Sequence, residues 1–152
     1  PKPFLGHIEV IQRNAVESWT RLDPRPEIFL VGEDEGTKET AEEFGVKHIP
    51  EIARTEHGTP RLDSMFQAAE GAAQNQILCY VNADIILMDD LMRAVEQVRD
   101  WERRSMMSGQ RWDLDVENPL DFESNWEEQL RGRLEHSGRL HAATGADYYV
   151  YR

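Results

Sequence analysis

The chain has 152 residues, of which 39% are hydrophobic and 30% charged, and its formal net charge is -12 at pH 7. This composition is typical of one globular domain spanning residues 1–152 rather than of a disordered segment. The negative charge argues against broad contact with nucleic acid or with an anionic membrane, because both would repel the chain. No apolar run approaches the roughly 20 residues that a membrane-spanning helix needs, and no signal peptide is visible.

The first elements alternate between helix and strand. Apolar side chains recur at helical spacing over residues 7–22, and the prolines of the run 23–26 end that helix. The continuous apolar run 28–31 is typical of a strand covered on both faces. A loop then leads into a short helix over residues 37–44, which Gly45 ends, and residues 46–49 predict a second strand.

The second half of the chain continues the alternation. A helical stripe is formed by apolar side chains between residues 62 and 73, and the run 77–81 predicts a buried strand. The next helix is expected to be capped by Asp89 or Asp90. Further elements are a strand at Met106 and Met107, a helix opened by the capping box Ser124-x-x-Glu127, and a strand over residues 148–151.

This alternation predicts an α/β fold, in the form of a three-layer α/β/α sandwich with a mostly parallel sheet. A helix at the start and a strand at the end indicate that one element is missing on each side. The single cysteine, Cys79, lies in an apolar run and is predicted to be a buried core residue in a cytoplasmic protein. The five histidines show no spacing that indicates a zinc site.

Asn82 and Asp84 directly follow the predicted strand 77–81. In an open parallel sheet, ligands bind beyond the carboxyl ends of the strands, and alternate residues point the same way. An amide oxygen and a carboxylate are hard ligands suited to Mg²⁺ or Mn²⁺ bridging a diphosphate. The alternative is an ordinary turn, since asparagine and aspartate both favour turns.

The segment Tyr80-Val81-Asn82-Ala83-Asp84-Ile85-Ile86-Leu87 resembles the strand and acidic metal motif of GT-A glycosyltransferases. Further segments resemble, in the same order, a family-2-like branch of that fold found in bacteria and plants. They are Ile11-Gln12-Arg13-Asn14-Ala15, Gly58-Thr59-Pro60, Ser64-Met65-Phe66, Gly109-Gln110-Arg111-Trp112-Asp113-Leu114-Asp115 and Thr144-Gly145-Ala146-Asp147-Tyr148-Tyr149. The resemblance implies a transferase that moves a sugar from a UDP- or GDP-sugar to the hydroxyl of a carbohydrate or other acceptor.

The resemblance also assigns roles on the donor side. Asp84 would bind the Mn²⁺ or Mg²⁺ ion, and Asn82 would assist it or hold the ribose, with Ala83 between them. The commoner motif has an acid at the position of Asn82, so metal dependence is less firmly implied than nucleotide binding. The remaining donor contacts would come from Glu33, Asp34 and Arg61, although Arg61 is equally well explained as a surface arginine.

On the acceptor side, Trp112 would offer a flat face to a sugar ring, beside the polar groups of Arg111, Asp113 and Asp115. The alternative is a capped turn with Trp112 packed on the core. Asp147 is the candidate general base within the chain, and its alternative role is structural or acceptor-binding. The resemblance implies that the true base lies in an acidic motif beyond Arg152.

Two other functions remain open. The same fold could serve as a non-catalytic nucleotide or nucleotide-sugar binding module. A receiver-type phosphoacceptor domain with Asp84 as its target would need a lysine late in the chain, whereas the lysines are Lys2, Lys38 and Lys47.

Overall fold

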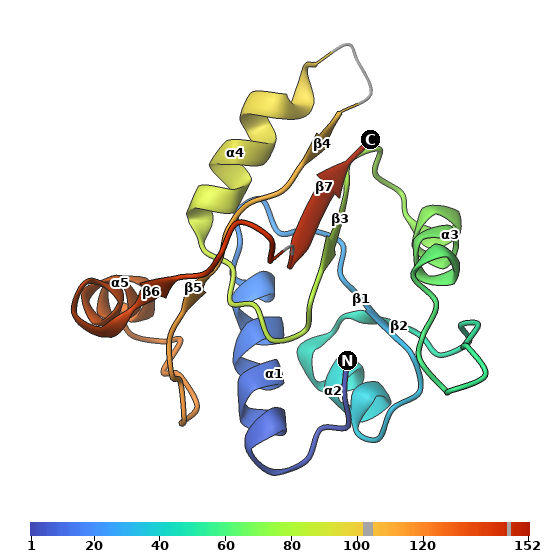
Figure 1. Cartoon of the computed structure of the whole chain (residues 1–152), viewed down its shortest axis with the longest axis horizontal. Helices are drawn as coiled ribbons and strands as arrows, with labels where there is room; N and C mark the ends of the chain where they lie inside the picture. Colours follow the sequence, from blue (N-terminus) through green and yellow to red (C-terminus); the bar gives the residue numbers. More distant parts are fainter. Residues whose placement is uncertain (102–104, 146) are drawn as a thin grey trace.

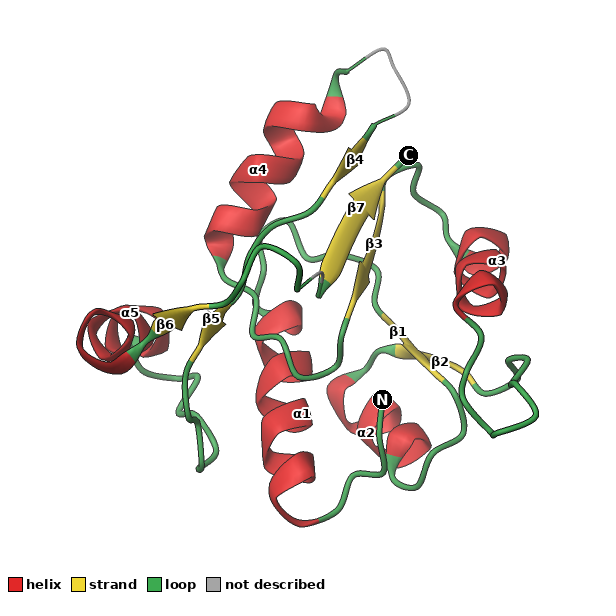
Figure 2. Ribbon diagram, in the orientation of Figure 1, coloured by secondary structure: helices red, strands yellow, loops and turns green. Residues whose placement is uncertain are grey.

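The computed structural model describes residues 1–101, 105–145 and 147–152, so Ala146 of the segment 144–149 lies outside the described residues. Within these ranges the chain is a mixed α/β protein with five helices and three small sheets (Figure 1). Figure 2 shows the helices distributed around the strands. None of the described helices is long and apolar enough to cross a membrane.

The first region follows the sequence closely. It consists of α1 (Gly6–Thr20), β1 (Phe29–Val31), α2 (Thr37–Phe44) and β2 (Lys47–Ile49). β1 and β2 pair in parallel, with Leu30 opposite His48. These elements confirm the predicted helix, strand, helix and strand, with boundaries shifted by at most two residues.

Gly45 ends α2 as predicted, because it adopts the left-handed backbone (φ 61°) that favours glycine. Its N–H donates to the carbonyls of Ala41 and Glu42, which satisfies two carbonyls at the helix end. Gly36 precedes the helix with φ 80°, and a Cβ there would lie 2.7 Å from the Cβ of Phe4. Glycine at both ends of α2 therefore lets the chain turn tightly against the N-terminal segment.

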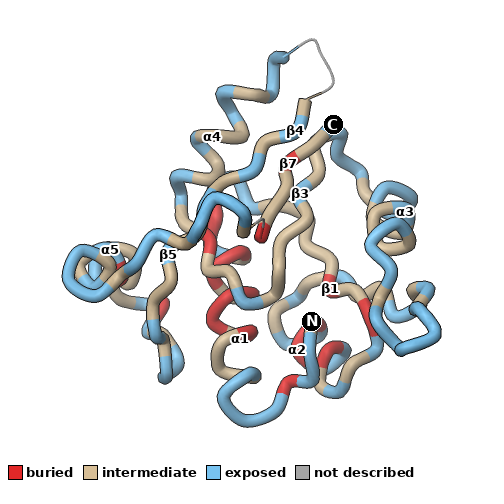
Figure 3. Tube along the Cα trace, viewed as in Figure 1, coloured by how far each residue is buried: buried red, intermediate tan, exposed pale blue. Residues whose placement is uncertain are grey.

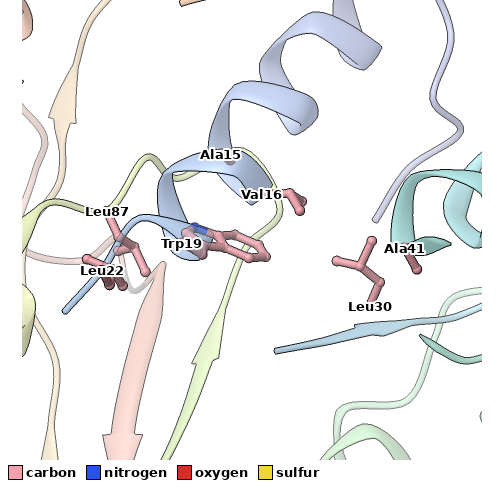
Figure 4. Close-up of a cluster of buried hydrophobic side chains, with 7 residues drawn as sticks. All are labelled: Ala15, Val16, Trp19, Leu22, Leu30, Ala41 and Leu87. Atoms are coloured by element: carbon pink, nitrogen blue, oxygen red, sulfur yellow. The ribbon is translucent and has the colours of Figure 1, made fainter. Parts of the chain in front are cut away.

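The buried core lies in and around this first region. Figure 3 shows buried positions concentrated along α1 and around α2. The cluster in Figure 4 comes from α1 and the segment directly after it, from β1 and α2, and from the loop after β3, and contains Ala15, Val16, Trp19, Leu22, Leu30, Ala41 and Leu87. Of β1 only Leu30 is buried, so the expected coverage of that strand on both faces is not found.

The second region contains α3 (Leu62–Ala72), β3 (Leu78–Val81), α4 (Asp89–Arg99), β4 (Met106–Met107) and β7 (Tyr148–Tyr151). β7 lies between β3 and β4 and is antiparallel to both. α3 and α4 carry the predicted apolar stripes, yet neither helix has a buried residue. Cys79 on β3 is exposed, so its predicted burial is wrong, because the strand borders an open cleft.

Hydrogen bonds from two residues of α1 join the two regions. The indole Nε1 of Trp19 donates to the carbonyl of Ile85 at 2.9 Å. The hydroxyl of Ser18 accepts the N–H of Leu87 at 3.0 Å and donates to the carbonyl of Ala15. The C-terminal part of α1 therefore fixes the loop that follows β3.

The remaining elements are β5 (Trp112–Asp113), β6 (Arg139–Leu140) and α5 (Trp126–Ser137). β5 and β6 form an antiparallel pair at positions where the sequence predicts no strand. Each strand has only two residues, which is too short to carry a period-2 pattern.

Two groups of predictions need correction. The described strands are mostly antiparallel, with β1 and β2 the one parallel pair among them, because β7 returns against β3 and no strand joins β1 to β3. The predicted caps are also wrong: α4 begins after Met88 and α5 after Asn125, without a side-chain cap at either position. Asp89 and Asp90 lie instead in the first turn of α4, where their charge favours the helix dipole.

Candidate functional site

The segment after β3 forms a turn. The N–H of Ile85 donates to the carbonyl of Asn82 at 3.1 Å, which closes a four-residue turn over residues 82–85. The N–H of Asn82 donates to the carbonyl of Asp147 at 2.9 Å and continues the pairing of β3 with β7. Asn82-Ala83-Asp84 therefore form a turn, as the alternative interpretation of this segment predicts. The turn leaves Asp84 exposed beyond the end of β3.

The amide of Asn82 is engaged at both of its atoms. The hydroxyl of Tyr80 donates to its Oδ1 at 2.9 Å, and its Nδ2 donates to Oδ1 of Asp147 at 3.1 Å. Burial raises the pKa of Tyr80, and the negative charges of Asp84 and Asp147 raise it further, so its hydroxyl keeps the donated proton. Asn82 thus positions Asp147 relative to β3.

Asp147 is buried, with 7% of its surface exposed, and forms an ion pair with Arg111 through its second oxygen. Both oxygens are therefore occupied, which favours the structural role over the catalytic one. Arg111 donates from Nε to Oδ1 of Asp113 at 2.9 Å, and Oδ2 of Asp113 lies 2.9 Å from Nδ1 of His141. These residues form one continuous polar network from Tyr80 to His141.

The network shifts the acidity of Asp113. The hydrogen bond from His141, followed by that from Arg111, lowers the pKa of Asp113 from 3.8 to about 2. The same carboxylates raise the pKa of Arg111, chiefly through its hydrogen bond to Asp147. Asp113 therefore stays ionised, and Arg111 charged, at any physiological pH.

The β5–β6 pair assembles this part of the network. Asp113 lies opposite Arg139, whose guanidinium is 3.5 Å from Oδ2 of Asp113, and the N–H of His141 donates to the carbonyl of Arg111. Trp112 lies opposite Leu140 and is 53% exposed, so it is not packed in the core. Its ring is available to a ligand beside the charged group.

The charges of Asp34 and Asp84 both act on the N-terminal amino group of Pro1. Burial lowers the pKa of the Pro1 amino group, while the charges of Asp34 and Asp84 raise it and that of Arg54 lowers it. Asp34 follows β1 and accepts a hydrogen bond from Arg54 at 3.2 Å. The carboxylates that follow β1 and β3 thus both influence the pKa of the Pro1 amino group, although the strands belong to different sheets.

Other predicted site residues lie outside these groups. Arg61 pairs with Asp63 and both side chains are exposed, which matches the surface-arginine alternative. Glu33 is exposed, and Ala83 packs against the core. Asp115 is exposed, and its carbonyl accepts a hydrogen bond from Arg133 at 2.6 Å.

At Asp84 the chain offers a metal ion one carboxylate ligand rather than a complete set of protein ligands. Within the described part of the chain, no three His, Cys, Asp or Glu side chains come together as ligands. Oδ1 of Asn82 already accepts the hydroxyl of Tyr80. Magnesium is commonly held by one or two carboxylates together with substrate phosphates, so Asp84 suits an ion that arrives with a diphosphate.

Sequence reasoning missed three members of the site: Tyr80, Arg54 and His141. His141 was examined for zinc spacing alone, whereas its partner is a carboxylate 28 residues earlier. The sequence pattern that could have identified His141 is Arg139-x-His141, shortly before Asp147. Alternate residues of a short strand there would present both side chains to one neighbouring strand.

The chain was also compared with known proteins. No protein-family model matches it, and no match was found among curated proteins.

Proposed function

We propose that this chain binds a nucleoside-diphosphate sugar with a divalent cation and serves as the core of a GT-A-type glycosyltransferase. The observation that carries the proposal is the network of Asn82, Asp147, Arg111 and Asp113. These residues belong to three separate segments that each resemble the family, and side-chain contacts link them beside Asp84. A chance resemblance gives no reason for such segments to meet.

In this proposal Asp84 holds the cation together with the diphosphate, while Asp34 accepts a hydroxyl of the ribose. The cation supplies charge neutralisation to the leaving nucleoside diphosphate. Trp112 contacts a sugar ring with its exposed face. The hydrogen bonds from His141 and Arg111 keep Asp113 ionised as a hydrogen-bond acceptor for sugar hydroxyls. The finer architecture, a three-layer GT-A sandwich, is part of the same proposal.

Calorimetric titration tests the donor site. UDP, GDP and their sugar derivatives are titrated with Mn²⁺ into the chain and into Asp84→Ala, with the exposed Glu117→Ala as the matched control. We expect metal-dependent binding that Asp84→Ala weakens at least about tenfold, or about 1.4 kcal/mol, and that Glu117→Ala leaves unchanged. Equal binding by the chain and Asp84→Ala would remove the site assignment.

The second candidate is a binding module of the same kind without turnover. It is favoured by Asp147, whose two oxygens are both engaged and which therefore lacks a free oxygen to take a proton. Donor hydrolysis in the presence of Mn²⁺ separates the two. Hydrolysis that is lost in Asp147→Asn supports the enzyme, whereas tight binding with no hydrolysis or transfer supports the module.

A further inference from the structure

The imidazole of His141 is held by two side chains of the polar network. Its Nδ1 lies 2.9 Å from Oδ2 of Asp113. A terminal nitrogen of Arg111 lies 3.1 Å from Nδ1 and 3.4 Å from Nε2. An atom at these distances within the ring plane would collide with Cε1, so the guanidinium lies over the face of the ring. Asp113 therefore holds one edge of the imidazole, and Arg111 covers one face.

The edge of the ring away from Asp113 packs on the backbone of Gly145. The N–H of Gly145 donates to the carbonyl of Ala142 at 3.0 Å, which closes a four-residue turn directly after His141. A Cβ at Gly145 would lie 2.9 Å from Nε2 of His141 and closer still to Cδ2. A residue with a side chain would thus displace the ring. The orientation of His141 is therefore fixed by three neighbours.

These contacts decide which ring nitrogen carries the proton. Arg111 has hydrogen-bond donors only, and ionised Asp113 has acceptors only. The pKa of Asp113 is lowered to about 2, so its Oδ2 accepts a hydrogen bond at neutral pH. Nδ1 therefore carries the hydrogen, and Nε2 of the neutral ring has a lone pair in the ring plane. Within the part of the chain that the structure describes, the one polar side chain near Nε2 is Arg111, over the ring face.

The carboxylates of the same network are poorer proton acceptors than His141. Asp147 is 7% exposed, and its oxygens are engaged by Asn82 and Arg111. Both oxygens of Asp113 are engaged as well, and its low pKa makes it a weak base. The side chain of His141, in contrast, keeps 31% of its surface exposed, so an incoming hydroxyl can reach the ring.

The network connects His141 to the segment that carries Asp84. Arg111 contacts both His141 and Asp147, and Asp147 accepts a hydrogen bond from Asn82. Asn82 begins the turn that contains Asp84. Two side chains, those of Arg111 and Asp147, thus separate His141 from the turn.

We propose that His141 is the general base of the sugar transfer, oriented by Asp113, Arg111 and Gly145. This role rests on the proposed function. The proton of the acceptor hydroxyl passes to Nε2 of His141 while the acceptor oxygen forms its bond to the anomeric carbon of the donor. The bond between that carbon and the diphosphate oxygen breaks, and its electron pair leaves with the nucleoside diphosphate. With water as the acceptor, the same steps hydrolyse the donor.

The first test needs no nucleotide and reads the tautomer of His141 from the NMR signals of its ring nitrogens, at a pH where the ring is neutral. We expect the hydrogen on Nδ1. In Asp113→Asn the new amide oxygen must face Arg111, which only donates, so the amide NH₂ faces Nδ1. The hydrogen of His141 should then move to Nε2. A hydrogen on Nε2 in the unchanged chain would overturn the proposal.

The second test measures hydrolysis of UDP- and GDP-sugars with Mn²⁺. His141→Gln should slow hydrolysis at least about 100-fold, since a general base commonly contributes that much, and should leave donor affinity unchanged in calorimetry. His136→Gln on the exposed side of α5 is the matched control and should change neither quantity. Imidazole in solution should partly restore hydrolysis in His141→Ala, which a purely structural role of His141 would not allow.

The two readouts separate this role from the proposed function. If the donor binds and His141→Gln hydrolyses it at the rate of the unchanged chain, the role of His141 is wrong and the donor site stands. If the unchanged chain binds donor without any hydrolysis, the role is also wrong and the binding module remains. If no donor binds, the proposed function fails, and the role of His141 fails with it.

Discussion

The two regions of this molecule have similar amphipathic patterns and different degrees of burial. α1 and α2 contribute fully buried residues such as Val16 and Thr37, whereas α3 and α4 contribute none. α1 lies against β1 and the loop after β3, while α3 faces the cleft. An apolar stripe therefore identifies the face that a helix would bury, but the presence of a partner surface decides whether it is buried.

The largest expected effect comes from truncating the same residue type on the two edge strands. Leu30 on β1 is 2% exposed, and Leu30→Ala should reduce the free energy of unfolding by about 3 kcal/mol through lost burial and the cavity left behind. Leu78 on β3 is half-buried, so Leu78→Ala should cost only about 1 kcal/mol. Urea denaturation of both variants measures the difference. Equal costs would contradict the unequal burial of the two regions.

Ser18 tests the connection between the regions. Its hydroxyl is fully buried and bonds to both the N–H of Leu87 and the carbonyl of Ala15. Ser18→Ala leaves the N–H of Leu87 without a partner, which should cost about 2 kcal/mol in the free energy of unfolding.

The matched control for this change is Ser137→Ala at the exposed end of α5. Its hydroxyl also donates to a carbonyl, that of Arg133 at 3.1 Å, but it is open to water. This variant should change the free energy of unfolding by less than about 0.5 kcal/mol. If Ser137→Ala reduced the free energy of unfolding as much as Ser18→Ala does, burial of the Ser18 hydroxyl would not explain the cost of removing it.

The smallest expected effect concerns pH and the polar network. Since the folded-state pKa of Asp113 is about 2, below its usual 3.8, ionised Asp113 stabilises the fold above about pH 4. That contribution is lost as the pH falls from about 4 through 2. Carbon-detected NMR titration should give a midpoint near 2 for Asp113.

Variants identify the cause of this shift. His141→Ala removes the largest contribution and should raise the pKa of Asp113 toward its usual value. Asp115→Ala, two positions away and outside the network, should leave the midpoint of Asp113 where it is. If the titration midpoint of Asp113 were the same in His141→Ala as in the unchanged chain, this would contradict the hydrogen bond between the two residues.

Much of the first region could be predicted from the sequence, because its signals are local. The prolines at 24 and 26 and Gly45 end helices for reasons that lie within a few residues. The strand that ends at Val81 and the polar residues Asn82 and Asp84 after it were also predicted from local pattern. Side chains at strand ends could thus be named as candidates without a structure.

The pairing of distant segments could not be predicted in this way. The antiparallel return of β7 against β3 and the β5–β6 pair join residues separated by 26 or more positions, and short strands carry no local signal of their partner. The contact between Asp113 and His141 depends on that pairing. The apolar run around Cys79 likewise predicted a buried residue, whereas β3 pairs with β7 on one side and borders the cleft, and Cys79 is exposed.

The most direct test of the central claim locates the cation by NMR. Substoichiometric Mn²⁺ is added with UDP or GDP, and the paramagnetic broadening of backbone amides is compared between the chain and Asp84→Ala. The account predicts broadening centred on residues 82–85 and Asp34 that requires the nucleotide and is absent in Asp84→Ala. Broadening spread over the acidic helix surfaces, equal with and without nucleotide and equal in the variant, would contradict it.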